Sequence, residues 1–112
     1  MENVYNKDLT DIRFSYNWNN KLFCKAFTTF RIHNNKKYLS GNNYNIIYKN
    51  QFFCIATIID KRTITIDKIN DYVSYLDTGY NQKTFIELIS KMYPTMNNID
   101  KQLFDFILLH RL

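Results

Sequence analysis

Glycine, proline and cysteine are scarce in this chain of 112 residues, which has only 2 Gly, 1 Pro and 2 Cys. So few Gly and Pro residues exclude long flexible linkers, and the length fits one domain with a single core. Cys24 and Cys54 lie in apolar stretches with no Cys or His cluster around them. This excludes a zinc site and indicates reduced, buried thiols. We therefore expect no metal and no cofactor.

Long apolar runs are also missing. No segment approaches the roughly 20 apolar residues that cross a bilayer as a helix, and Met1, Glu2 and Asn3 do not open an apolar signal peptide. We expect a cytoplasmic protein with no membrane partner. The sequence also has no glycine-rich phosphate loop and no nucleophile elbow, which excludes the common nucleotide hydrolases and the α/β-hydrolases.

Aromatic and basic residues are plentiful instead. Aromatic residues make up 17% of the chain, with 9 Tyr and 9 Phe, and the formal net charge is +5. Large rings fill the interior of a small β-barrel well. The positive charge favours an anionic partner such as RNA or a nucleotide, although charge that serves only solubility is an equally good explanation.

Apolar and polar residues alternate over much of the first two thirds of the chain, which is the period of half-buried strands. The β-branched and aromatic content of these stretches favours the same assignment. Three residues, 49–51, are short enough for a hairpin connection. The predicted strands cover residues 12–16, 22–32, 44–48, 52–59 and 63–66.

The period then changes to that of helices. Asp67 can cap a helix that starts at Lys68, and a second helix runs from Asn81 until Pro94 ends it. The apolar faces expected for the two helices are Ile69, Tyr72, Val73 and Leu76, and Phe85, Leu88, Ile89 and Met92. The apolar run 103–109 predicts a last strand. The fold class is therefore α+β, a closed or nearly closed small mixed β-barrel with two short helices.

Residues 24–31, Cys-Lys-Ala-Phe-Thr-Thr-Phe-Arg, resemble the signature of ASCH domains, small barrels of the PUA-like superfamily. Residues 37–42 resemble the turn that precedes a strand in this family. Further along, 53–58 resemble its hairpin strand, 85–94 its late helix and 104–109 its closing strand. The resemblance implies an ASCH/PUA-like domain over residues 21–112, with residues 1–20 as an N-terminal extension packing on the barrel.

The family resemblance also implies a function. ASCH-like proteins bind RNA or handle nucleotides, and one compact subgroup hydrolyses acylated cytidine nucleosides with a Lys, a Thr and a Glu. The Lys position falls on Lys25 or, in the other frame, on Ala26, and the Thr position on Thr28 or Thr29. The Glu position falls near Asp77, where the chain has no Glu. The resemblance thus points to Lys25, Thr29 and Asp77 as catalytic residues.

Arg31 interrupts an otherwise apolar strand. Its guanidinium suits a phosphate or base edge, or an ion pair with a carboxylate such as Asp60 or Asp77. Because alternate residues of a strand share a face, Thr29 and Arg31 are expected to point together, with Lys25 on the same side. The carboxylate of Asp77 could then orient Lys25.

Further ligand contacts are expected around this strand. Tyr80 could stack on a base or cover the core. Lys36 and Lys37 could join Lys25 and Lys21 in a basic rim, or be scattered solvated lysines. His33 and His110 have no ligand partners at metal spacing.

These residues predict a cleft between strand residues 28–31 and the interhelical residues 77–80. We expect an RNA- or nucleotide-binding domain, with Lys25, Thr28, Thr29, Arg31, Lys36, Lys37 and Tyr80 as its binding residues. A small amidohydrolase acting on acylated cytidine nucleosides is the first alternative. The second is a phage-type module that binds a host protein. The fold does not decide among the three.

Overall fold

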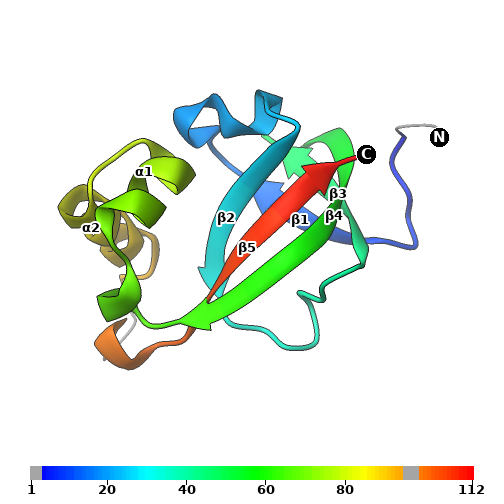
Figure 1. Ribbon diagram of the computed structural model, residues 1–112. Coiled ribbons are helices and arrows are strands. Elements are labelled where there is room, and N and C mark those ends of the chain that lie inside the picture. The colour runs from blue at the N-terminus through cyan, green and yellow to red at the C-terminus, as the bar shows by residue number, and fades with distance from the viewer. Residues whose placement is uncertain (1–3, 95–98) are drawn as a thin grey trace.

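One mixed sheet of five strands, in the order β1-β3-β4-β5-β2, forms the body of the molecule. The computed structural model describes residues 4–94 and 99–112. β1 runs parallel to β3, and all other neighbours are antiparallel. The sheet is curled into a half-barrel (Figure 1). Its strands are β1 (Thr10–Phe14), β2 (Ala26–Ile32), β3 (Asn43–Tyr48), β4 (Gln51–Ile64) and β5 (Phe104–Arg111).

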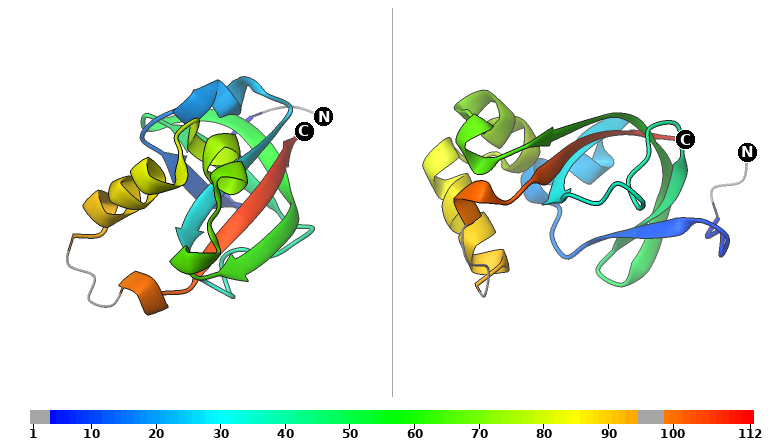
Figure 2. Two further views of the ribbon diagram at one scale, coloured as in Figure 1. Left: turned by 60° about the vertical axis from the view of Figure 1, so that its left-hand side comes forward. Right: turned by 90° about the horizontal axis from the view of Figure 1, so that it is seen from below.

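The two α-helices lie together at one end of the molecule, and the C-terminus lies toward the opposite end (Figures 1 and 2). They are α1 (Asp71–Thr78) and α2 (Gln82–Met92), and both lie between β4 and β5 in the sequence. Three short 3-10 helices complete the secondary structure: η1 (Trp18–Phe23), η2 (Ile66–Lys68) and η3 (Ile99–Lys101). The fold class is therefore α+β, as predicted.

The sheet separates two apolar cores. The first fills the inside of the curl and contains Phe14, Phe27 and Ile107. The second lies between the sheet and the helices, where Phe30 packs on Phe85 and stacks on Phe104. Strand β2 serves both cores because its residues alternate between the two faces. Thr29 and Arg31 therefore share the inner face with Phe27, whereas Thr28 shares the outer face with Phe30.

Most strands occur where they were predicted, but two predicted bounds are wrong: β1 covers 10–14 rather than 12–16, and β2 starts at Ala26 rather than Leu22, because Leu22 and Phe23 belong to η1. The hairpin joins β3 to β4 through Lys49 and Asn50, which both have positive φ and thus match the right-handed twist of the strands. Residues 103–109 were predicted as a strand, and β5 indeed pairs with both β4 and β2. The two strands predicted at 52–59 and 63–66 are one continuous strand, β4. Its register against β5 shifts between Ile58 and Asp60, and such irregularities bend a strand.

The N-terminal segment is more than an extension that packs on the barrel. Residues 10–14 form β1, which pairs with β3 at the edge of the same sheet. Ile12 and Phe14 of this strand belong to the core inside the curl. The boundary expected at residue 20 therefore separates two parts of one folded unit.

The first helix differs from its prediction. It starts at Asp71 rather than Lys68, because Asn70 is the cap and its side chain accepts a hydrogen bond from the Val73 amide. Half of the predicted apolar face is also wrong, since Tyr72 is 76% exposed and Leu76 is 54% exposed. The other two residues of that face, Ile69 and Val73, do pack in the core beneath the helices. The buried residues of α1 are instead Ser74, Asp77 and Thr78. Their polar groups are hydrogen-bonded, which is the condition for burying them.

The second helix follows its prediction closely. Asn81 caps α2 and its side chain accepts a hydrogen bond from the Thr84 amide. Phe85 and Ile89 are buried in the core between the helices and the sheet. The predicted apolar face ends in Met92, which is 58% exposed and takes part in the site described next.

Candidate ligand-binding site

A cavity of about 480 Å³ lies where β1 and β2, the two edge strands of the sheet, approach the helices. This volume falls within the usual range of small-molecule sites, roughly 300–1,000 Å³. β1 and the segment after it, η1, β2, α1 and α2 all contribute to the lining. The residues used below are Arg13, Phe14, Tyr16, Trp18, Lys21, Thr29, Arg31, Asp77, Lys91 and Tyr93.

Arg31 connects the two edge strands. Its Nη2 donates a hydrogen bond of 2.6 Å to the backbone oxygen of Arg13 in β1, and its Nε donates one of 2.9 Å to the Thr29 hydroxyl. The guanidinium carbon lies 4.6 Å from the centre of the Phe14 ring. Burial lowers the pKa of Arg31, but a guanidinium stays protonated in proteins. The cavity therefore holds a permanent, fixed positive charge.

Lys21 and Asp77 form a buried ion pair beside Arg31. Lys21 Nζ lies 2.9 Å from Asp77 Oδ1, and their side chains are only 6% and 5% exposed. The hydroxyl of Thr28 donates a hydrogen bond of 2.8 Å to the same carboxylate oxygen. Burial lowers the pKa of Lys21, and the attraction of Asp77 opposes this while the nearby charge of Arg31 adds to it. The amine therefore loses its proton more readily than an exposed lysine.

Two places where the backbone has positive φ, at Asn19–Asn20 and at Gly79, hold Lys21 against α1. Asn19 and Asn20, just before it, both have positive φ, a conformation that Asn tolerates better than most residues. The Asn19 side chain donates a hydrogen bond to the Tyr75 oxygen and packs on Gly79. Gly79 ends α1 with a φ of +80°, as is common at helix C-termini. This contact fixes η1, and with it Lys21, at the end of the helix that carries Asp77.

Positive charge and aromatic rings dominate the lining of the cavity. Arg13, Lys21, Arg31 and Lys91 are its cations, and Asp77 is its single carboxylate among the described residues. Because Lys21 already pairs with Asp77, the cavity keeps an excess of positive charge. The rings of Phe14, Tyr16, Trp18, Phe30, Phe85 and Tyr93 form much of the remaining wall.

Several of the residues predicted for the site do meet at this cavity. Thr29, Arg31 and Asp77 line it, and Thr28 contacts it through Asp77. Tyr80 lies beside it, with its ring centre 5.8 Å from that of Trp18. The edge position of β2 explains why both faces of the strand contribute.

The three other predicted lysines do not line the cavity. Lys25 is exposed and precedes β2, so the strand alternation that linked it to Thr29 does not reach it. Lys36 and Lys37 lie in the connection between β2 and β3, where both backbone amides bond to the Asn34 side chain. The lysine that does meet Asp77 is Lys21, which the sequence marked only as part of a basic rim. No signal in the sequence marks Lys21 as the partner of Asp77, because the two residues lie 56 positions apart.

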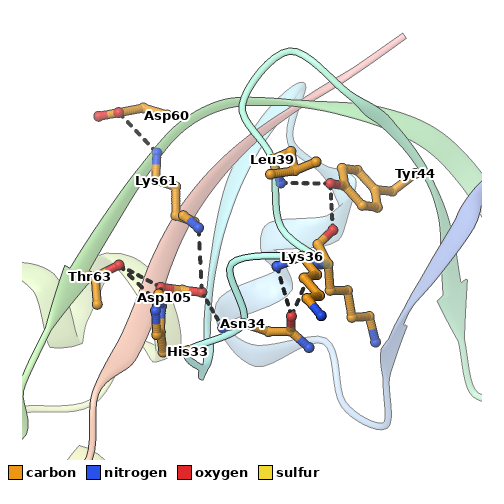
Figure 3. Close-up of polar contacts among 10 residues, drawn as sticks. His33, Asn34, Lys36, Leu39, Tyr44, Asp60, Lys61, Thr63 and Asp105 are labelled. Atoms are coloured by element: carbon orange, nitrogen blue, oxygen red, sulfur yellow. Dashed lines mark hydrogen bonds and ion pairs between the residues drawn. The ribbon is translucent and has the colours of Figure 1, made fainter.

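A second polar cluster surrounds Asp105, which is fully buried in β5 (Figure 3). Its carboxylate accepts hydrogen bonds from His33 Nδ1 at 2.7 Å, from the Asn34 amide at 2.9 Å and from the Thr63 hydroxyl at 2.8 Å. Burial by itself raises the pKa of Asp105, but these bonds and the charge of Lys61 outweigh it, so that the pKa is lowered. None of these residues lines the cavity. The cluster fixes the start of the β2–β3 connection.

Residues 4–94 and 99–112 contain no group of three or more His, Cys, Asp or Glu residues that could hold a metal ion. Within the same ranges, no helix has the length and apolar character needed to cross a membrane. Comparisons with models of protein families, with characterised proteins and with solved structures gave no match to this chain.

Proposed function

We propose that the cavity binds the phosphate and ring of a nucleotide-like ligand, either a free nucleotide or one residue of an RNA. The observation that carries this proposal is the unpaired charge of Arg31. The two carboxylates considered as ion-pair partners of Arg31 have other partners, because Asp60 pairs with Arg62 and Asp77 pairs with Lys21. Among the described residues, no carboxylate lies within ion-pair distance of Arg31. Arg31 is thus a fixed guanidinium without an ion-pair partner, and such a group suits a phosphate of the ligand.

The rest of the lining supports a nucleotide rather than a simple anion. Trp18 and Tyr93 offer flat apolar surfaces in the same cavity as Arg31, and aromatic side chains bind bases of any sequence by stacking. The chain as a whole carries a net charge of +5, which attracts polyanions.

The finer fold assignment is part of this proposal. A half-barrel with a helical pair inserted before its last strand is compatible with an ASCH-like member of the PUA-like superfamily. The ligand cavity lies beside the strand Thr-Thr-Phe-Arg, the segment in which the sequence resembles that family. RNA or nucleotide binding is the function that this resemblance implies.

Trp18 offers a direct assay, because it lines the cavity and the chain contains only 1 Trp. Its fluorescence should change on titration with a nucleoside monophosphate or a short single-stranded RNA. Binding of the RNA should weaken steeply with salt, since each neutralised phosphate releases a counterion. An RNA affinity that stays flat between low and high salt would exclude this binding mode.

Two variants that remove the same unit of charge locate the binding site. Arg31→Gln should weaken binding of both ligands at least about tenfold, since it removes a charge-assisted hydrogen bond. Lys25→Gln removes an exposed charge outside the lining and should leave monophosphate binding within about twofold. Equal losses in the two variants would indicate diffuse electrostatic attraction without a site.

A second candidate function is hydrolysis of an acylated cytidine nucleoside. The observation in its favour is Lys21, a buried amine whose pKa is lowered and whose Nζ is bonded to Asp77. Thr29 lines the same cavity, and its hydroxyl accepts a hydrogen bond from Arg31 Nε. A lysine that loses its proton readily has a neutral amine, which can act as a general base toward a hydroxyl nucleophile. In this version of the hypothesis Lys21, rather than Lys25, takes the role of the family Lys.

This hydrolase hypothesis is tested with N4-acetylcytidine as substrate. Lys21→Met and Thr29→Val should each abolish turnover, whereas Lys25→Gln should retain it. Wild-type protein that releases no acetate above background would reject the hydrolase and leave the binding function standing. Turnover that survives both Lys21→Met and Thr29→Val would show that other residues perform the chemistry.

A further inference from the structure

Three aromatic side chains form a row beside the cavity. The ring centres of Tyr16 and Trp18 lie 5.1 Å apart at an interplanar angle of 43°. Those of Trp18 and Tyr80 lie 5.8 Å apart at 71°. Tyr16 and Trp18 also line the cavity. The row therefore starts within the ligand-binding site and continues outward from it to Tyr80, and we refer to these three residues as the ring row.

The two ends of the ring row are open to solvent. Tyr16 is 63% exposed and Tyr80 is 43% exposed, while Trp18 between them is partly buried. Each ring follows an element that ends at the cavity, since Tyr16 comes after β1 and Tyr80 comes directly after Gly79, the C-cap of α1.

The charges next to the ring row favour a polyanion as its occupant. Arg31 and Lys91 line the adjoining cavity and have no ion-pair partner among the described residues. The remaining lysine there, Lys21, neutralises Asp77. Open aromatic rings beside unpaired cations are the combination by which proteins hold single-stranded nucleic acid, with bases on the rings and phosphates on the cations.

We infer that the ligand is a single-stranded nucleic acid rather than a free nucleotide, with one residue in the cavity and its neighbours stacked on the ring row. This inference rests on the proposed function and names its ligand class. Tyr16 and Tyr80 are the stacking platforms. Trp18 contacts both rings and lines the cavity.

The experiment compares uridine monophosphate with a short oligouridylate, which has little structure of its own. Trp18 fluorescence reports binding of the monophosphate, and the anisotropy of an end-labelled strand reports binding of the oligouridylate. In the wild type the oligouridylate should bind at least about tenfold more tightly. Tyr80→Ala, which changes a ring outside the cavity lining, should weaken oligouridylate binding about tenfold, in line with the loss of one base–ring stack, and leave monophosphate binding within about twofold.

Matched variants separate stacking from other effects. Tyr80→Phe keeps the ring and should bind the oligouridylate like the wild type, whereas Tyr80→Leu keeps apolar area only and should lose as much as Tyr80→Ala. Tyr72→Ala removes a tyrosine that is 76% exposed on α1 and outside the ring row, and it should change nothing. Because Tyr80 is 43% exposed, these variants should all fold, and their thermal midpoints verify this.

The outcomes distinguish the two levels of the proposal. If the wild type binds the monophosphate but holds the oligouridylate no more tightly, the ring row is not a binding surface and the nucleotide site stands. Equal losses for Tyr80→Ala and Tyr72→Ala also overturn the ring row. If the wild type binds neither ligand, the proposed function fails and this inference fails with it.

Discussion

The Nη2 atom of Arg31 in β2 lies 2.6 Å from the backbone oxygen of Arg13 in β1. β1 and β2 are the two edge strands of the sheet, so the side chain of Arg31 connects the two edges of the curled sheet. The hydrogen bonds to Arg13 and Thr29 occupy Nη2 and Nε. Nη1 has no partner among the described residues, and Arg31 lines the cavity. Arg31 is therefore held in place by the fold before any ligand binds.

Arg31→Lys tests whether this fixed geometry matters beyond the charge. An ammonium group on a flexible stem cannot bond to Thr29 and Arg13 in the planar geometry of a guanidinium. We expect nucleoside monophosphate affinity to fall about tenfold although the charge is kept. The titration of Trp18 fluorescence measures this. Affinity equal to the wild type would mean that the cavity needs only a cation at this position.

Removing one member of the Lys21–Asp77 pair should destabilise the fold strongly. Lys21→Met or Asp77→Leu leaves the other charge buried and unpaired, a change that typically costs about 3–5 kcal/mol of unfolding free energy. Replacing both residues together should restore most of the loss, because no unpaired charge remains. Urea unfolding of the two single variants and the double variant measures the coupling.

The exposed pair Arg62–Asp60 is the control for this experiment. Its side chains are 77% and 54% exposed, and exposed pairs contribute about 0–1 kcal/mol. Asp60→Asn should therefore change the urea midpoint very little. If Asp77→Leu costs no more than Asp60→Asn, the pair at the cavity is not buried in solution as described here.

Gly79 and Gly41 form a matched pair for testing the contact between η1 and α1. Both have positive φ, but a Cβ at Gly79 would lie 3.2 Å from the Asn19 side chain, whereas a Cβ at Gly41 would meet nothing within 4 Å. Each Ala substitution should cost about 1–2 kcal/mol for the left-handed backbone.

Gly79→Ala should cost more than Gly41→Ala and should also weaken ligand binding, because Asn19 precedes Lys21 in η1. Urea unfolding and Trp18 titrations of both variants check this. Equal loss of stability with unchanged binding would show that the Asn19–Gly79 contact does not position the site.

Asp105 should make the fold sensitive to acid. Its pKa is lowered in the folded protein from an ordinary value of 3.8, so its ionised form stabilises the fold above that value. This stabilisation is lost as the pH falls from about 3.8 through the lower pKa of the folded state.

The difference in unfolding free energy between wild type and Asp105→Asn should therefore be large at neutral pH and shrink as the pH falls below about 4. Urea titrations of both proteins across this range measure it. A difference that stays constant down to the lowest accessible pH would contradict the role of the ionised carboxylate in holding His33, Asn34 and Thr63.

The strands and α2 could be predicted because local pattern determines them. In β5, Phe104, Ile107 and Leu109 of the apolar run are buried, and the strand pairs with a neighbour on each side. In α2, the helical spacing of Phe85 and Ile89 matches burial on one face. Thr29 and Arg31 could be assigned to one side for the same reason, since strand alternation is a local rule.

Helix α1 and Lys21 could not be predicted because tertiary contacts reverse the local pattern. Tyr72 and Leu76 are exposed on α1, while Asp77 is buried where Lys21 and Thr28 satisfy its carboxylate. Nothing near Asp77 in the sequence reveals a partner 56 positions earlier. The exposure of Tyr16 likewise depends on where β1 ends, and strand boundaries are difficult to read from pattern alone.

The central claim is that Arg31 receives the phosphate of a ligand, and one pair of titrations tests it most directly. Trp18 fluorescence is followed while uridine monophosphate or uridine is added to wild-type protein and to Arg31→Gln. The wild type should bind the monophosphate at least about tenfold more tightly than uridine, and Arg31→Gln should bind the two alike. Equal affinity of the wild type for both ligands, or a preference for the monophosphate that survives Arg31→Gln, would contradict the account.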